Sequence, residues 1–274
     1  MGGQGVKRVT MLKGAIHVHS TYSDGEFTLA ELRELFLKEG CQFLCMTDHA
    51  EAFDEAKLRV YVDECRALSD ERFRFIAGLE YECEQRMHVL SFGAAQLLDT
   101  INPQEVIQRV ADNGGLSVIA HPMDQAFPWI ETFDTLPDGI ETWNAKYDGR
   151  YAPRTRTFDL LQRLKERRQK MNAFYGVDLH WKLQYRGLFT HVDCLVPTDS
   201  EILAAFVGGR FRGVKDGQEL PSDGHLLEGV KTDFERARAK SDRFRRVVKS
   251  LKNVLKQTGM KVPAPIKAQL RRFF

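Results

Sequence analysis

The sequence predicts an α/β barrel in which parallel strands alternate with helices, and three observations favour this fold class. Short apolar runs rich in Val, Ile and Phe alternate with longer segments of helical periodicity, as in repeated βα units. The 274 residues are close to the roughly 250 of one such barrel. Apolar residues make up 43% and charged residues 28% of the chain, so it can bury a sizeable core and is not disordered throughout.

Seven segments are predicted as strands, and an eighth is a further candidate. They are Ala15–His19, Gln42–Thr47, Arg74–Glu80, His88–Phe92, Leu116–Ala120, Gly139–Trp143 and Ala173–Asp178, with Val192–Val196 as the eighth. Helices are expected between strands, at about 28–39, 54–68, 103–113, 152–170 and 198–206. Thr28 with Glu31, and Thr198 with Glu201, have capping-box spacing and mark two of the helix starts.

Charge is distributed unevenly along the chain. Residues 226–274 contain 14 Lys and Arg against 4 Asp and Glu, a charge of +10, which leaves −8 for residues 1–225 because the whole chain carries +2. An acidic body joined to a basic tail indicates chemistry in one part and attachment in the other. We therefore expect a catalytic barrel over residues 1–225 and a basic amphipathic helical extension over 226–274.

Apolar residues of this extension recur at three-and-four spacing, which places them on one helical face. They are Phe234, Ala237, Phe244, Val247, Val248, Leu251, Val254 and Leu255. Three interpretations remain open for this face and its basic surroundings: packing on the barrel or a second subunit, binding to an anionic membrane surface, or binding to nucleic acid.

Cysteine use and hydropathy bear on the compartment. The five cysteines include no CxxC pair, which argues against a disulfide framework and a zinc knuckle and indicates reduced thiols in the core. No apolar run approaches the length of a transmembrane helix, and the N-terminus lacks a signal peptide. We expect a cytoplasmic protein, peripheral at the inner membrane surface if the tail binds lipid.

Histidines and carboxylates gather where the predicted strands end. Carboxyl ends of the strands share one face of a parallel barrel, so residues distant in sequence converge there. In His17-x-His19 and Asp178-x-His180, the two-residue period of extended chain points both side chains to the same face. The candidate metal ligands are His17, His19, Asp24, His49, Glu80, His88, His121, Asp178 and His180.

This donor set favours Mn, Fe or Zn, because imidazole and carboxylate suit these ions and the lack of thiolates disfavours a closed structural zinc site. Nine ligands exceed what one ion can use. We therefore expect two or three divalent ions with a bridging carboxylate, an arrangement suited to phosphoryl hydrolysis.

The motifs that carry these residues resemble those of the PHP family, named for its polymerase and histidinol phosphatase members. They are HVHSTYSDG at 17–25, TDH at 47–49, the Glu80 strand, HVLSFG at 88–93, AHP at 120–122 and GVDLH at 176–180. The resemblance covers about residues 14–206. It implies a distorted (β/α)7 TIM-like barrel, up to three metal ions at its mouth, and phosphoester hydrolysis.

The resemblance also implies how the ligands are shared. His17, His19, Glu80 and Asp178 would hold the first ion; Glu80 would bridge to a second held by His88 and His121; and Asp24, His49 and His180 would hold the third. On this hypothesis Glu80, Asp178 and His180 are catalytic, and the nucleophile is a metal-activated hydroxide. Asp48 is expected to orient His49 or another ligand.

Substrate-binding residues are predicted with less support from the pattern. Lys146 and Arg150 follow a strand at its carboxyl end and could grip a phosphate, and His191 could serve as an acid. Trp143 and Trp181 could stack on a ring or pack in the core.

The sequence thus predicts a metal-dependent phosphoesterase that hydrolyses a small phosphomonoester or a nucleotide. Two alternatives stay open. One is an exonuclease or RNA-processing hydrolase with the same metal site, and the other is a non-catalytic interaction module stabilised by its metals.

Overall fold

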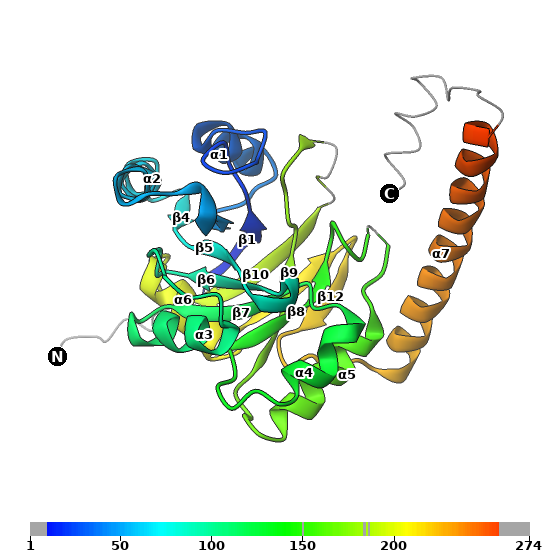
Figure 1. Cartoon of the computed structure of the whole chain (residues 1–274). Coiled ribbons are helices and arrows are strands. Elements are labelled where there is room, and N and C mark those ends of the chain that lie inside the picture. The colour runs from blue at the N-terminus through cyan, green and yellow to red at the C-terminus, as the bar shows by residue number, and fades with distance from the viewer. Residues whose placement is uncertain (1–9, 150, 183–184, 186, 258–274) are drawn as a thin grey trace.

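Figure 1 shows the computed structural model of the chain, which describes residues 10–149, 151–182, 185 and 187–257. Beyond Arg243, Arg246 is the one residue whose side chain is described. The molecule is a mixed α/β fold in which two six-stranded sheets are surrounded by helices. This confirms that the chain is of the α/β class, as predicted, but not that it forms a barrel.

The first sheet has the order β12-β11-β10-β1-β2-β4. Its strands are β1 (Thr10–Val18), β2 (Phe43–Met46), β4 (Arg74–Ile76), β10 (Leu188–Cys194), β11 (Phe211–Lys215) and β12 (Gln218–Pro221). β1 is parallel to β2 and antiparallel to β10, and β10, β11 and β12 pair as an antiparallel meander. The sequence analysis missed β11 and β12, and it placed β10 four residues too late.

The second sheet has the order β3-β5-β6-β7-β8-β9. Its strands are β3 (Asp48–His49), β5 (Leu79–Glu82), β6 (His88–Phe92), β7 (Leu116–Ala120), β8 (Gly139–Asn144) and β9 (Asn172–Gly176). Pairing is antiparallel between β5, β6 and β7 and parallel in the rest of this sheet.

The predicted TIM-like barrel does not appear as a single closed sheet among the described strands. The predicted strand Gln42–Thr47 matches β2, and the chain then passes into the other sheet as β3, whereas the predicted strand Arg74–Glu80 is divided between the sheets as β4 and β5. This division falls at Gly78, where a Cβ atom would lie 1.9 Å from the carbonyl oxygen of Ser91, so the chain bends at a residue that must be glycine. At the other side, Val18 and Leu179 form one parallel bridge between β1 and the chain after β9.

Helices cover the sheets as amphipathic patterns predict. They are α1 (Leu29–Lys38), α2 (Glu55–Ala67), α3 (Pro103–Asp112), α4 (Phe127–Ile130), α5 (Thr155–Lys165), α6 (Asp199–Val207) and α7 (Glu228–Gln257), with 3₁₀ turns η1 (Ala50–Ala52), η2 (Glu84–Arg86) and η3 (Asp124–Ala126). Thr28 and Glu31 form the predicted capping box of α1, and Thr198 accepts a hydrogen bond from the amide of Glu201 at the start of α6.

Alternate residues of both sheets meet in one apolar cluster. It includes Leu12 and Ile16 of β1, Leu90 and Phe92 of β6, and Ile202 and Phe206 of α6. These side chains fill the space between the sheets, so the interior is a packed core and not a channel. All five cysteines are buried and free, which agrees with the predicted reduced thiols.

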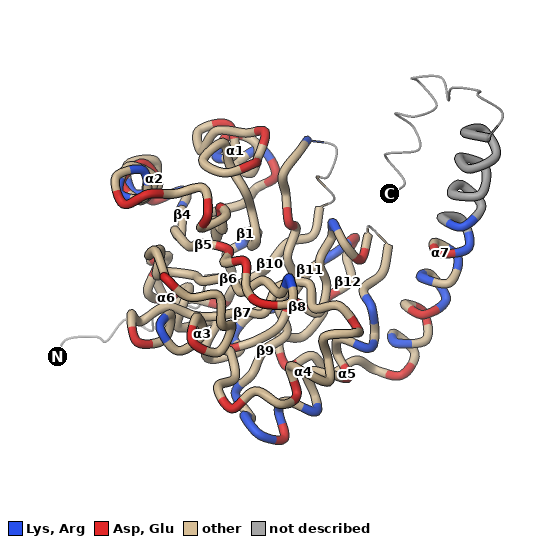
Figure 2. The backbone as a smooth tube through the Cα atoms, in the orientation of Figure 1, with Lys and Arg blue, Asp and Glu red and all other residues tan. Residues whose placement is uncertain are grey.

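Helix α7 runs up one side of the body and projects beyond it. Figure 2 shows Lys and Arg interspersed with Asp and Glu along the part of this helix whose side chains are described. Its first part is docked: Phe234 is buried with its ring 5.7 Å from that of Trp143, and Lys231 lies 2.8 Å from Asp159. The packing interpretation therefore holds for the start of the apolar face. From Phe244 onward the face lies outside the described side chains, and the boundary at residue 225 stays a prediction.

No helix in the described part of the chain combines the length and the apolar character needed to cross a membrane.

We expect Phe234→Ala to lower the free energy of unfolding by about 3 kcal/mol, because it removes a buried aromatic ring and leaves a cavity beside Trp143. Urea unfolding followed by circular dichroism measures this loss. Arg236→Ala is the matched control on the same helix, since the Arg236 side chain is exposed, and it should change stability by less than about 0.5 kcal/mol. Equal stability of the two variants would contradict the docking of α7.

Candidate metal centre

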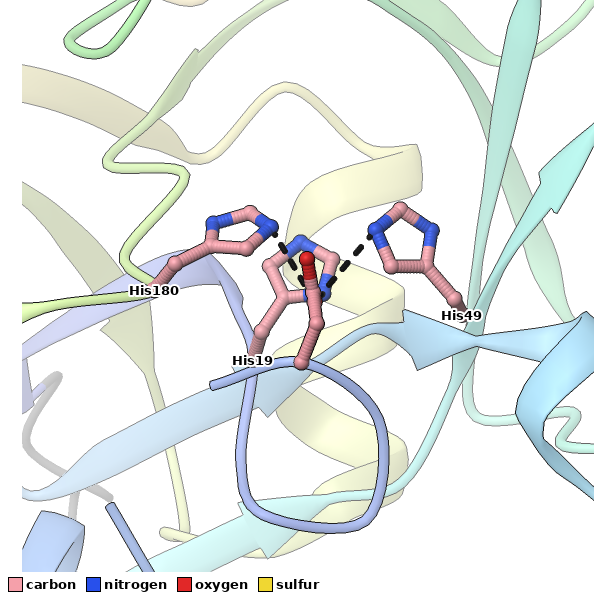
Figure 3. A group of neighbouring side chains, drawn as sticks. His19, His49 and His180 are labelled. Atoms are coloured by element: carbon pink, nitrogen blue, oxygen red, sulfur yellow. Dashed lines mark ion pairs between the residues drawn. The ribbon is translucent and has the colours of Figure 1, made fainter. Parts of the chain in front are cut away.

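The nine candidate ligands lie together although they come from separate segments of the chain: most end or follow a strand, whereas Glu80 lies within β5 and His88 begins β6. The donor atoms of eight of them, all but His88, form three groups in which all atoms lie within 4.8 Å of one another. The groups are His19, Asp24, His49 and His180; His17, Glu80 and His121; and His17, His19 and Asp178. Figure 3 shows His19, His49 and His180 turned toward a common point.

Glu80 lies at the centre of the cluster. Its Oε1 is 2.6 Å from His88 Nδ1 and 3.2 Å from His121 Nε2. Its Oε2 is 3.3 Å from His17 Nε2, 3.2 Å from His19 Nε2 and 3.5 Å from His49 Nδ1. One buried carboxylate thus contacts five imidazoles, which is the placement that a bridging ligand requires.

Charge and burial oppose each other at Glu80 and His17. Burial alone would raise the pKa of Glu80, but the charge of His17 and hydrogen bonds from neighbouring imidazoles hold this pKa well below its usual value. Burial would lower the pKa of His17, and the carboxylates of Glu141, Asp178 and Glu80 raise it instead. These groups stabilise each other's charged forms, so each can stay charged while buried only if the others are present.

Asp178 links two of the three groups. Its Oδ1 lies 3.8 Å from the Nε2 atoms of both His17 and His19, and 3.1 Å from His180 Nδ1. On the other side, Lys146 Nζ is 3.2 Å from the same oxygen. A cation therefore already lies beside the cluster, at its more exposed edge.

The residues fit divalent ions, and His19 shows this most directly. Its side chain is fully buried, and its Nδ1 has no hydrogen-bond partner among the described residues, a state that costs free energy unless something else binds there. Its Nε2 lies 3.2 Å from Glu80 Oε2. Burial lowers its pKa to about 3, so the ring is neutral and has a lone pair to donate. With oxygen and nitrogen donors around it, His19 is suited to Mn, Fe or Zn.

The backbone is strained at three of the nine positions. His17, His121 and Asp178 have φ of 62°, 29° and 49°, in a region that residues other than glycine rarely adopt. At His17 the register of β1 against β2 shifts, so the strand bulges and turns the imidazole inward. Each such residue costs of the order of 1–3 kcal/mol and persists only where its surroundings fix it, which is typical of functional sites.

Comparison with known proteins decides the family, because the PHP domain signature matches residues 15–166, more than half of the chain. The chain belongs to the PHP family. The histidine and carboxylate cluster described above agrees with this assignment. The predicted resemblance is confirmed.

One curated relative of the PHP chain is the DNA polymerase/3'-5' exonuclease PolX of Bacillus subtilis, with 29% identity over 133 residues. The match covers 40% of this chain and 23% of the relative, so the chain spans about a quarter of that protein's length.

Two solved structures share the fold. A two-domain protein containing a predicted PHP-like metal-dependent phosphoesterase from Bacteroides vulgatus superposes with a TM-score of 0.56 and 15% identity, over 84% of this chain and 70% of that one. PsfC from Pseudomonas syringae superposes with a TM-score of 0.53 and 14% identity, over 76% of this chain and 93% of that one. At these identities the likeness concerns the fold alone.

Glu141 is a buried carboxylate of the PHP site that the sequence analysis did not single out. Its Oε1 accepts a hydrogen bond from His17 Nδ1 at 2.8 Å, and its Oε2 accepts from the amide of His121 and from Asn144 Nδ2, both at 2.9 Å. It thereby orients two candidate ligands from behind. The signal was present, because Glu141 is an acidic residue within an otherwise uncharged strand.

Gly176 makes room for Glu141. A Cβ atom at this position would lie 1.7 Å from Glu141 Oε1 and 3.1 Å from the His17 side chain. The glycine of the GVDLH motif is therefore a steric requirement of the site, since any side chain there would displace the carboxylate that holds His17.

Asp48 holds a loop and not His49. Its carboxylate accepts hydrogen bonds from the amide and hydroxyl of Ser20, at 2.8 and 2.9 Å, and from the hydroxyl and amide of Ser23, at 2.7 and 3.1 Å. These bonds fix the loop that joins His19 to Asp24. Asp48 therefore positions the loop that carries the candidate ligand Asp24, and not the His49 side chain.

The predicted substrate-binding residues do not all lie at the cluster. Lys146 lies at the cluster, as described above, and Arg150 lies outside the described residues. His191 is not brought to the site: it lies on β10 opposite Lys13 of β1, four residues before His17, and its other charged neighbours include Arg212, Glu219 and Asp193. Trp143 is buried in the core, whereas Trp181 is exposed with its ring 5.5 Å from that of His180.

We expect Glu141→Gln to weaken metal binding by about 10- to 100-fold, the usual effect of losing a carboxylate behind a metal-binding histidine. The carboxylate accepts from three donors, and an amide would turn its own NH₂ toward one of them. Calorimetric titration with Mn²⁺ measures the affinity. The control Glu166→Gln lies in an exposed position after α5 and should bind Mn²⁺ like the wild type. An unchanged affinity of Glu141→Gln would refute this role.

Proposed function

We propose that the protein hydrolyses a small phosphomonoester or a nucleotide, using two or three divalent ions of Mn, Fe or Zn. The observation that carries this proposal is the convergence of eight imidazole and carboxylate side chains around the carboxylate of Glu80. Ions bound there would supply a water molecule activated at neutral pH and positive charge for the phosphate oxygens.

The protein's own residues would position the reactants. Glu80 and Asp178 present carboxylate oxygens at the centre of the cluster, where they can orient ligands and accept hydrogen bonds from an attacking water. Lys146, a quarter exposed, would bind a phosphate oxygen through Nζ. His180, 3.3 Å from Asp24 Oδ1 and 3.3 Å from Lys146 Nζ, joins the carboxylates to this phosphate site.

We also propose that the two sheets are halves of one distorted (β/α)7 barrel. The hydrogen bonds between β1 and the chain after β9 support this, since the His19 amide donates to the Leu179 carbonyl at 3.0 Å and the Val177 amide donates to the Ile16 carbonyl at 3.0 Å. The interruptions at Thr47 and Gly78, between β2 and β3 and between β4 and β5, would then be local distortions of the barrel wall.

A second candidate function is exonuclease or RNA-processing activity at the same site. The 29% identity to a polymerase that carries a 3'-5' exonuclease favours it, and so does the basic character of α7. Incubation with a single-stranded oligonucleotide separates the candidates, because an exonuclease shortens the chain while a phosphomonoesterase only removes a terminal phosphate.

The partner of α7 is a separate question. Its basic residues could bind anionic lipid or nucleic acid, both through salt-sensitive contacts. Sedimentation with anionic vesicles and a binding titration with RNA distinguish these two partners.

We expect the double variant Asp178→Asn with His180→Ala to lose at least one bound ion per chain and to lower hydrolysis of an aryl phosphate by more than about 100-fold, because both side chains donate to the metal groups. Elemental analysis and phosphate release measure the two effects.

The control is the double variant Asp223→Asn with His225→Ala. It has the same Asp-x-His spacing in the exposed segment after β12, and it should keep both metal content and activity. Full activity of the Asp178 and His180 variant would refute the site. A wild-type protein that binds ions but cleaves no ester would instead favour the non-catalytic interaction module.

A further inference from the structure

A cavity of about 750 Å³ lies at the end of β9 opposite to the metal centre. Asn172, the first residue of β9, is part of its wall, whereas the candidate ligands Asp178 and His180 follow the last residue of this strand. The two ends of β9 are about 13 Å apart, because a strand rises about 3.3 Å per residue. Small-molecule sites have volumes of roughly 300–1,000 Å³. The cavity is therefore large enough for a ligand and separate from the metal centre.

The floor of this cavity can accept hydrogen bonds, but its own donors are already used. Asn172 and Ser222 lie there, with only 7% and 8% of their surface exposed. The Asn172 Nδ2 donates to the carbonyl oxygens of Phe206 and Val207, at 2.9 and 3.5 Å. The Ser222 hydroxyl donates to the Gly209 carbonyl at 2.6 Å. Asn172 Oδ1, in contrast, accepts no hydrogen bond from a described residue. A ligand that reaches the floor must therefore bring its own donors.

Gly209 keeps the acceptors of the floor uncovered. A Cβ atom at this position would lie 3.2 Å from Asn172 Oδ1 and 3.4 Å from Ser222 Oγ. Its φ of 67° is also one that glycine adopts far more readily than other residues. The lack of a side chain at Gly209 thus leaves room in front of both oxygen atoms.

Two lysines line the cavity, and neither forms an ion pair with a described residue. Lys165 Nζ donates to the backbone carbonyl of Asp223 at 2.9 Å, and no contact of this kind is found for Lys170 among the described residues. On the same helix as Lys165, Arg163 is paired, 2.6 Å from Glu131. Ammonium groups without a carboxylate partner favour an anion in the cavity beside them.

The acidic side chains that line the cavity already have partners. Glu219 lies 3.1 Å from Arg212, and Asp223 Oδ1 accepts a hydrogen bond from the His225 amide at 2.8 Å. The two lysines therefore decide which charge the cavity prefers. Because they repel an amine, the donors that the floor requires are hydroxyl groups. Val207 and Pro221 add an exposed apolar wall on which the C–H groups of a sugar can pack.

We propose that this cavity binds a small anion derived from a sugar, whose phosphate or carboxylate group contacts Lys165 and Lys170 and whose hydroxyl groups donate to Asn172 and Ser222. The site is distinct from the metal centre. Binding there requires no metal ion and is independent of the proposed hydrolysis.

The first test is calorimetric titration of the full chain with ribose 5-phosphate, in EDTA so that no divalent ion takes part. The double variant Lys165→Met with Lys170→Met should bind about tenfold more weakly or worse, because two charge-assisted contacts are lost. The matched control, Lys38→Met with Lys240→Met, removes the same charge at two exposed positions outside the cavity and should bind like the wild type. Equal affinity of the two double variants, or no binding to the wild type, overturns the proposal.

The second test concerns the hydroxyl groups of the ligand. Ser222→Ala removes one acceptor of the floor and leaves both lysines in place, and circular dichroism checks that the variant is folded. We expect it to weaken the binding of ribose 5-phosphate several-fold and to leave the binding of inorganic phosphate unchanged, since only the sugar donates to Ser222. An equal effect on the two ligands, or no effect on either, overturns the assignment of a sugar.

The anionic group of the ligand is decided by titration with gluconate and with ribose. Tighter binding of ribose 5-phosphate than of gluconate assigns a sugar phosphate, and the reverse order assigns a sugar acid, provided that the Lys165 and Lys170 variant loses the tighter ligand. Ribose is uncharged and should bind more weakly than either anion. Binding of ribose as tight as that of both anions overturns the role of the lysines.

Discussion

The burial of Glu80 among five imidazoles is the constraint on which the rest of the site depends. Removing a carboxylate from water costs several kcal/mol, and this cost is recovered only if partners stand at the right places. The left-handed backbone at His17, His121 and Asp178, and the glycine opposite Glu141, are the local means of placing them. The strained backbone positions and the buried charges therefore belong to the same cluster, because the strained residues are those that contact Glu80 or its neighbours.

The fold supplies the support that this arrangement needs. Side chains between the sheets, among them Phe92, Phe174 and Phe206, form a dense apolar layer on which the cluster rests. Because packed aromatic layers do not deform easily, the strand ends above them keep their relative positions. Among the described residues, the cluster is open at Asp24, Lys146 and His49, and this is the side from which a substrate can enter.

The sequence predicted most of the site because its signals are local. The carboxyl ends of parallel strands share one face, so motifs that follow strands can be grouped without tertiary information. The two-residue period itself does not hold, because His17 and Asp178 have positive φ and Asp178 and His180 lie beyond β9. Sheet pairing could not be predicted in this way: whether the strand at 74–80 stays whole depends on the approach of Ser91 to Gly78, a contact distant in sequence. The roles of Glu141 and His191 could not be predicted for the same reason, because the role of each residue depends on the strand that lies opposite.

The turn at 144–149 joins the candidate metal centre to α7. Asn144 Nδ2 donates to both Asp178 and Glu141 inside the site, while Arg238 of α7 donates to the Asp148 carbonyl at 3.4 Å and lies 3.9 Å from its carboxylate. Docking of Phe234 holds Arg238 at this position. The start of the basic helix is therefore a brace for the turn that presents Lys146 and Tyr147, in addition to whatever its projecting part binds.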